Sequence, residues 1–183
     1  MSVLISRYTA LLGTLDRASP VVLPTLARLV FSAVTLVYFW RSAVSKLGDG
    51  FFGFLSPSSN GYVQIFPKAM EAASYNTDNL NMFHWAVVTA GTWAEFILPL
   101  LILLGLLTRP AALGMIGFIA VQSLTDLYGH GGIAYVETLG AWFDRLPDGV
   151  ILDQRAFWVL ALLVLVFKGA GPLSLDRVFR NAK

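Results

Sequence analysis

The sequence predicts an all-α integral membrane protein, folded as a bundle of four transmembrane helices. The first observation behind this is composition: 56% of the 183 residues are hydrophobic and only 13% are charged, which is too apolar for one water-soluble domain. The second is that the apolar residues gather in four long runs. A run of about 20 apolar residues can cross a bilayer as a helix. We therefore expect a single membrane domain over residues 1–183.

Residues 2–15 form the first predicted element. Apolar side chains, among them Tyr8 and Leu15, recur there at helical spacing, but the stretch is too short to span a membrane. No small-residue cleavage site follows it, so we do not expect a signal peptide. The pattern suits a short amphipathic helix lying in the membrane interface. Pro20 and Pro24 should separate this helix from the first span.

Four spans and two long outer loops follow from the positions of the apolar runs. The spans are predicted at about residues 23–47, 82–107, 110–128 and 155–173, and the outer loops at 48–81 and 129–154. Almost no chain separates the second span from the third, so these two should form an antiparallel hairpin. Each outer loop carries a stretch that suits a short interfacial amphipathic helix, at residues 62–73 and 133–143.

The distribution of basic residues predicts that both termini face the cytoplasm. In this orientation eight Lys and Arg residues lie inside and five lie outside, as the positive-inside rule favours. The inner set is Arg7, Arg17, Arg28, Arg109, Lys168, Arg177, Arg180 and Lys183, and the outer set is Arg41, Lys46, Lys68, Arg145 and Arg155.

Glu95 is the most informative residue of the chain. It is the only formal charge between Met82 and Leu107, and it falls near the middle of that apolar run. A charged carboxyl at the centre of a spanning helix costs about 2.5–3.5 kcal/mol on insertion scales. A basic partner, a bound proton or a water-filled cavity must offset this cost.

Other polar side chains fall at depths that could bring them to Glu95. His84 shares a stripe of the second span with Glu95, while Tyr38 and Arg41 share a face of the first span, and Gln122 and Asp126 share a face of the third. The candidate pocket residues are therefore Glu95, Arg41, His84, Gln122, Asp126, Tyr38 and Lys46. If the three faces converge, a polar pocket lies between the membrane midplane and the outer surface.

We expect Arg41 to provide the positive charge in this pocket. It lies in the outer half of the first span and could pair with Glu95 or with Asp126. Lys46 ends the same span, and its long side chain should extend to the outer interface.

Three interpretations of the cluster stay open at this point. The buried polar groups could satisfy one another and fix the register of the helices, with no ligand. They could instead form a pocket for a small ligand or a quinone headgroup, because ionisable residues inside a membrane are commonly functional. They could also contact a partner subunit.

Composition limits the chemistry that the chain can perform alone. The sequence has no cysteine and two histidines, His84 and His130, so we expect no metal site and no covalently bound cofactor. The net charge of +2 is small, and the basic residues lie near the ends of the apolar runs. Nucleic-acid binding is therefore not expected, whereas membrane lipid and partner membrane subunits, or further copies of the chain, are.

Three sequence segments resemble the DoxX family. The run RSAVSKLG from Arg41 to Gly48 is similar to the family's first signature, although Ala43 stands where many members have glycine. Glu95, together with the run LLILLGLLTRPAA from Leu100 to Ala112, resembles the second signature. The run KGAGPLSLD from Lys168 resembles the glycine-rich end of family members. The resemblance extends from Leu26 to Asp176.

The resemblance implies a four-helix inner-membrane protein of a functionally diverse family. Members are associated with thiosulfate:quinone oxidoreductases, with membrane complexes that detoxify oxidants and with operons for metal-binding peptides, and distant relatives act as chaperones. The leading expectation is a membrane subunit of an oxidoreductase or electron-transfer assembly with a quinone pocket, more a non-catalytic subunit than an enzyme alone. The alternatives are a structural, assembly or chaperone-like subunit, and an accessory protein of a metal- or solute-handling system.

Overall fold

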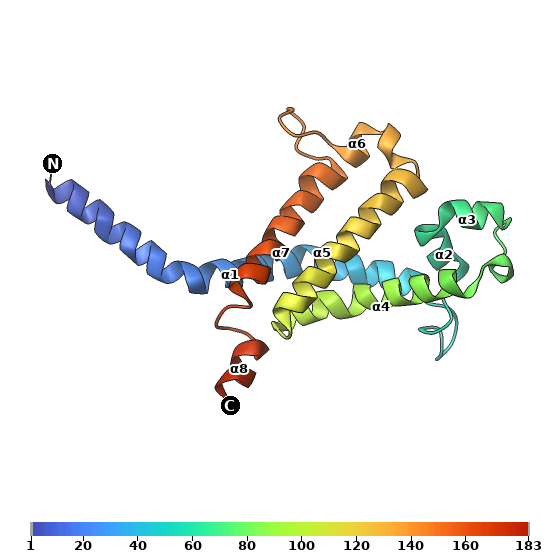
Figure 1. Ribbon diagram of the computed structural model, residues 1–183, viewed down its shortest axis with the longest axis horizontal. Coiled ribbons are helices and arrows are strands. Elements are labelled where there is room, and N and C mark those ends of the chain that lie inside the picture. Colours follow the sequence, from blue (N-terminus) through green and yellow to red (C-terminus); the bar gives the residue numbers. More distant parts are fainter. Residues whose placement is uncertain (1, 183) are drawn as a thin grey trace.

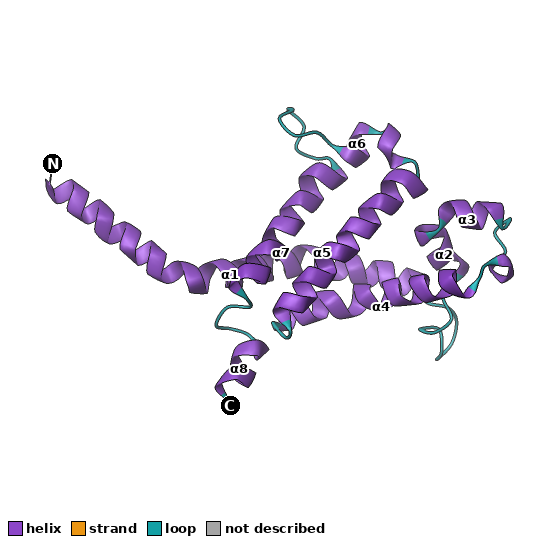
Figure 2. Ribbon diagram, viewed as in Figure 1, coloured by secondary structure: helices purple, strands orange, loops and turns teal. Residues whose placement is uncertain are grey.

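The computed structural model describes residues 2–182, and this part of the chain is helical without a strand (Figure 2). Lys183, counted above among the inner basic residues, lies outside the described residues, as does Met1. Four of the described helical segments are long and apolar enough to cross a membrane. They are α1 (Ser2–Lys46), α4 (Met82–Leu104), α5 (Thr108–Leu124) with the π-helical turn η2 (Thr125–Gly129), and the π-helical turn η4 (Val150–Arg155) with α7 (Ala156–Lys168). The predicted fold class is confirmed.

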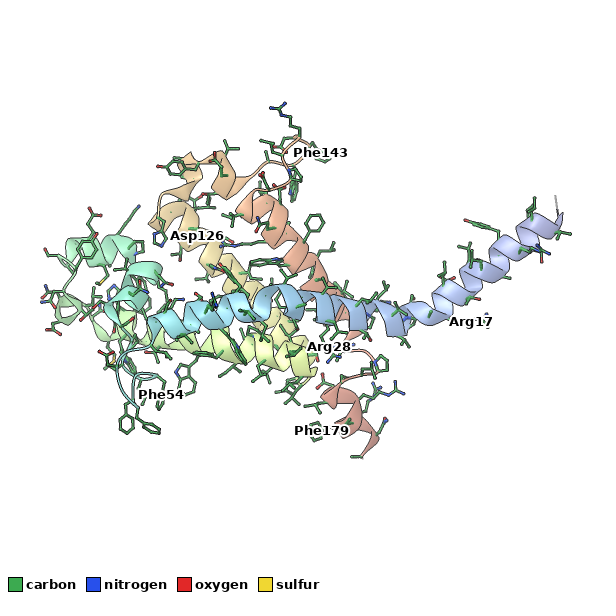
Figure 3. The ribbon with its side chains drawn as sticks, turned by 180° about the vertical axis from the view of Figure 1, so that it is seen from behind. Arg17, Arg28, Phe54, Asp126, Phe143 and Phe179 are labelled. Atoms are coloured by element: carbon green, nitrogen blue, oxygen red, sulfur yellow. The ribbon has the colours of Figure 1, made fainter. Side chains whose placement is uncertain are left out.

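The prediction of a separate amphipathic helix over residues 2–15 is wrong, because these residues are the first part of the long helix α1. It runs unbroken through Pro20 and Pro24 and bends between Arg17 and Arg28 (Figure 3). Proline removes one backbone hydrogen bond and kinks a helix, but the Ser19 hydroxyl donates to the Asp16 carbonyl at 3.2 Å, the carbonyl that Pro20 leaves without its helical donor. Side chains that take over such carbonyls allow a helix to continue through proline.

The predicted helices of the two long loops are also corrected. Residues 62–73 do not form one helix, because Pro67 interrupts it: α2 (Ser59–Ile65) ends and α3 (Pro67–Ala72) begins there. Residues 133–143 hold only a short turn and one helical turn, which ends at Gly140 with φ +73°. The remaining short elements are η1 (Thr77–Asn79), η3 (Gly132–Ala134), α6 (Val136–Leu139) and α8 (Leu175–Asn181).

Two of the predicted spans end earlier in the structure, each at a glycine. Gly105 has φ +64° and ends α4 at Leu104 rather than at 107, and Gly169 has φ +81° and ends α7 at Lys168 rather than at 173. Left-handed backbone is favourable for glycine and stops a helix. The fourth span correspondingly begins earlier than predicted, at Val150.

The four spans pack as two pairs that meet at one end. Helix α1 lies along α4 and α5 lies along α7, with further contacts between α1 and α7 and between α4 and α5 (Figure 1). All four contribute to one apolar core, which includes Phe39, Ile102, Met115 and Leu162. We call the end with the α4–α5 link and α8 the terminal end, and the end with α2, α3 and α6 the loop end.

The C-terminal segment is hydrogen-bonded to the α4–α5 link at the terminal end. Both carboxylate oxygens of Asp176 accept backbone N–H groups at the start of α5, from Leu107 at 2.7 Å and from Thr108 at 2.9 Å. The Asp176 N–H donates to the Gly105 carbonyl at 2.8 Å. Buried Arg28 bridges the same region by donating to the carbonyls of Leu103 and Leu173.

Gly105 should not tolerate a side chain. A Cβ there would lie 2.4 Å from Arg28 Nη1 and 2.6 Å from Ser174 Cβ, and left-handed backbone alone costs a non-glycine residue about 1–2 kcal/mol. We expect Gly105→Ala to lower the thermal unfolding temperature and yield of the detergent-purified protein. The control is Gly13→Ala, whose Cβ would meet no described atom within 4 Å and which should be neutral or slightly stabilising. Equal unfolding temperatures for the two variants would show that the close packing at Gly105 does not stabilise the folded protein.

Candidate functional site

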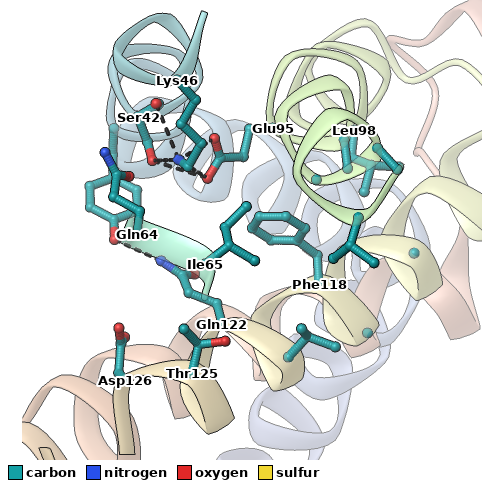
Figure 4. A pocket seen from close by; sticks show the side chains of 18 of the residues that line it. Ser42, Lys46, Gln64, Ile65, Glu95, Leu98, Phe118, Gln122, Thr125 and Asp126 are labelled. Carbon is teal, nitrogen blue, oxygen red and sulfur yellow. Dashed lines mark hydrogen bonds and ion pairs between the residues drawn. The ribbon is translucent and has the colours of Figure 1, made fainter. Parts of the chain in front are cut away.

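A cavity of about 540 Å³ opens at the loop end between α1, α4 and α5, with α2 beside it (Figure 4). We call it the loop-end pocket. Leu98, Phe118 and Val121 supply much of its apolar wall. Its polar lining is Tyr38, Ser42, Lys46, Gln64, Glu95, Gln122, Thr125, Asp126 and His130.

The pocket exists because α4 and α5 diverge. The short link after Leu104 holds them together at the terminal end, and they separate toward the loop end (Figure 1). The facing residues near the opening are small: Gly91 and Ala94 on α4, and Gly114 and Gly117 on α5. Small residues at these positions leave room between the two helices.

The positive partner of Glu95 is Lys46, not Arg41. Lys46 Nζ donates to Glu95 Oε2 at 2.8 Å and to Oε1 at 3.0 Å, and both residues are 3% exposed. The Ser42 hydroxyl donates to Glu95 Oε1 at 3.0 Å. The pair offsets the cost of placing each charge inside the membrane.

Arg41 is exposed and makes no side-chain hydrogen bond or ion pair within residues 2–182. The expected pairings of Arg41 are therefore wrong. At 100° per residue, Arg41 and Lys46 point roughly 140° apart around α1. The face that meets the pocket is Tyr38, Ser42 and Lys46, at spacings of four residues.

The expectation that Lys46 reaches the outer interface is also wrong, because α2 covers the end of α1. The Ser58 N–H donates to the Lys46 carbonyl at 2.9 Å. Gly61 of α2 lies so close that a Cβ there would be 3.2 Å from Lys46 Cβ and 3.1 Å from Val88 Cγ1. The lysine side chain consequently turns inward to Glu95.

A second ion pair joins the two π-helical turns at the loop end. Arg155 Nη2 donates to Asp126 Oδ2 at 2.5 Å, and Nη1 donates to the Ser123 hydroxyl at 2.9 Å. Arg155 is 4% exposed, and sequence reasoning did not select it. Its position at the start of an apolar run gives little signal, because a lysine or arginine there commonly extends to the interface.

Gln122 lines the pocket and carries one buried polar atom without a hydrogen-bond partner in the described chain. Its Nε2 donates to the Tyr38 hydroxyl at 2.9 Å, while Oε1 is buried and has no hydrogen-bond partner among residues 2–182. A buried unpaired polar group costs about 1–3 kcal/mol.

His130 lines the pocket in place of His84, the histidine that the sequence analysis selected. His84 is not in the pocket lining: its ring interacts with Asn81 in the cap of α4 and packs on Phe66 at 4.8 Å between centroids. His130, which sequence reasoning left out, lines the pocket, with Nε2 2.9 Å from the Gln64 carbonyl. Within residues 2–182 no three His, Asp or Glu side chains gather as they would to hold a metal ion.

The family model of DoxX matches residues 23–125, more than half of the chain. The protein belongs to the DoxX family. No curated protein and no solved structure matches the chain. The family region contains Tyr38, Ser42, Lys46, Glu95 and Gln122, so most of the polar pocket lies in the part that matches DoxX. Asp126, His130 and Arg155 lie beyond it.

The buried pair of this DoxX protein should behave as a unit in unfolding experiments. Glu95→Gln leaves Lys46 buried without a counter-charge, and Lys46→Met does the reverse for Glu95. Breaking a buried pair from one side costs about 3–5 kcal/mol, whereas replacing both partners is often nearly neutral. We expect each single variant to lower unfolding stability in detergent and the double variant to recover most of the loss.

Arg41→Gln is the matched control, since it removes one charge from the same helix at an exposed position. It should leave stability almost unchanged. Additive losses in the double variant, or an equal loss in Arg41→Gln, would show that Lys46 and Glu95 do not depend on each other.

Proposed function

We propose that the protein is a membrane subunit of an oxidoreductase assembly that binds the ring of a lipid-soluble quinone in the loop-end pocket. The observation that carries this proposal is the hydrogen-bonded pair of the Gln122 amide and the Tyr38 hydroxyl in the lining of a cavity between spanning helices. The volume lies in the range of about 300–1,000 Å³ usual for small-ligand pockets.

The surroundings of the pocket suit a ligand that arrives from lipid. Ala90, Gly117 and Val121 line it, and all three are exposed residues of spanning helices. The opening between α4 and α5 would therefore face acyl chains. At the other side the lining includes His130 and Gln64, which belong to the loop end. A ring bound here could contact both apolar side chains and groups near water.

The donors of the pocket suit quinone carbonyl oxygens. The Gln122 amide and the Tyr38 hydroxyl can donate, and Phe118 offers a flat apolar surface. A bound quinone would supply two-electron redox chemistry, and a partner subunit would exchange the electrons. The contribution of this chain is to bind and orient the ring and to hold the Lys46–Glu95 charges in place.

A structural role is the second candidate, and one observation favours it. The charged atoms of Lys46 and Glu95 already satisfy each other, with Ser42 completing the network. Buried polar pairs can fix helix register without binding anything. On this alternative the protein would hold or assemble partner membrane subunits, and the pocket would have no quinone affinity.

Binding of a short-chain ubiquinone analogue to the detergent-purified protein separates the two candidates. Losing one neutral hydrogen bond costs about 0.5–1.5 kcal/mol, so Gln122→Leu and Tyr38→Phe should each weaken the affinity roughly two- to tenfold. Stability should hardly fall. The control Gln154→Leu removes an exposed glutamine outside the pocket lining and should bind as the unaltered protein does. Absence of quinone binding to the unaltered protein would support the structural role.

We also propose that the protein lies in a bacterial inner membrane with both termini in the cytoplasm, so that the pocket occupies the outer half. Four spans place both ends on one side, and the basic residues favour the cytoplasm for that side. A reporter fused to the C-terminus should be active in the cytoplasm, and one inserted between Gly48 and Ser56 should be active in the periplasm. The reverse pattern would contradict the orientation.

A further inference from the structure

A second cavity, of about 350 Å³, lies at the terminal end. It is enclosed by α8, the chain between α7 and α8, the start of α5 and the bend of α1 at Pro20 and Val21. We call it the basic cleft, because it is lined by Arg109, Lys168, Arg177 and Arg180.

The positive charge of the basic cleft is largely uncompensated. Asp176 is the one acidic residue in its lining, and both oxygens of that carboxylate already accept backbone N–H groups of Leu107 and Thr108. Arg109 donates to the Phe167 carbonyl at 3.3 Å. The side chains of Lys168, Arg177 and Arg180 make no hydrogen bond or ion pair in the described part of the chain.

The position of the basic cleft matches the level of lipid headgroups. Lys168 is the last residue of α7 and Arg109 the second of α5, so both lie where spanning helices leave the bilayer. Phe167 beside Lys168 is 74% exposed, and Leu173 and Phe179 are also exposed. Cations therefore adjoin apolar side chains, as in a site for a molecule with a charged head and acyl chains.

We propose that the basic cleft binds the phosphate group of an anionic phospholipid. Arginine pairs with phosphate through two parallel hydrogen bonds, and basic pockets next to spanning helices are suited to anionic headgroups. Arg177 and Arg180 lie on α8, and Lys168 lies on α7. A phosphate held among them connects the C-terminal helix to the bundle. This site is separate from the loop-end pocket, and the proposal does not depend on quinone binding.

The test measures the thermal unfolding temperature of the full-length protein in detergent with four additions. These are short-chain phosphatidylglycerol, phosphatidylcholine with the same chains, glycerol phosphate and buffer alone. A ligand that binds the folded state raises the unfolding temperature. We expect phosphatidylglycerol to raise it by several degrees, and phosphatidylcholine and glycerol phosphate to have little effect.

Charge-matched variants assign the effect to the basic cleft. Arg177→Gln/Arg180→Gln should lose most of the phosphatidylglycerol shift, with an apparent affinity at least tenfold weaker. Lys68→Gln/Arg145→Gln removes the same charge from the loop end, outside the basic cleft, and should keep the shift. If the first variant fails to fold, Lys168→Gln replaces it and should lose part of the shift.

Four results would overturn the proposal. An equal shift with phosphatidylcholine would mean that detergent and chains, not the phosphate charge, cause it. An equal shift with glycerol phosphate would indicate a soluble phosphate ligand in place of a lipid. Equal losses in the cleft and loop-end variants, or no shift in the unaltered protein, would show that the basic cleft is not the binding site.

Discussion

The ion pair between Lys46 and Glu95 is the interaction on which the rest of the loop end depends. A membrane offers no water to either charge, so each needs the other, and their contact joins the last turn of α1 to the middle of α4. This contact fixes the position of the C-terminal end of α1 along α4. The chain after Lys46 must then turn back over that end, and Gly61 allows α2 to approach it closely.

The loop-end pocket follows from where the polar interactions are placed. Lys46–Glu95 holds α1 to α4, and Arg155–Asp126 connects the turns that extend α5 and α7. Across the opening, the Gln122–Tyr38 hydrogen bond links α5 to α1, and the His130 ring contacts the Gln64 carbonyl of α2. At the terminal end, the hydrogen bonds of Asp176 and the short α4–α5 link hold the pairs together. Helices that are fixed at one end and diverge at the other leave a cavity between them.

Sequence reasoning located the four spans and singled out Glu95, because hydropathy and a lone charge within an apolar run are properties of the sequence itself. It failed on the partner of that charge: Arg41 and Lys46 differ by a rotation around α1, and either face is compatible with a spanning helix. The stripe of Tyr38, Ser42 and Lys46 was available as a signal. The burial of Arg155 and the place of His130 beside the pocket depend on π-helical turns and on how the long loops fold back. Neither feature can be read from the periodicity of the sequence. Ser19 offers a local reason why α1 continues at Pro20.

The charge state of Glu95 tests the central claim most directly. An infrared difference spectrum between the unaltered protein and Glu95→Gln, recorded in lipid bilayers near neutral pH, isolates the signal of this one carboxyl group. If Lys46 neutralises Glu95 as an ion pair, the spectrum will contain the stretching bands of an ionised carboxylate, and these will shift in Lys46→Met. A carbonyl band of a protonated acid in the unaltered protein, insensitive to Lys46→Met, would contradict the account.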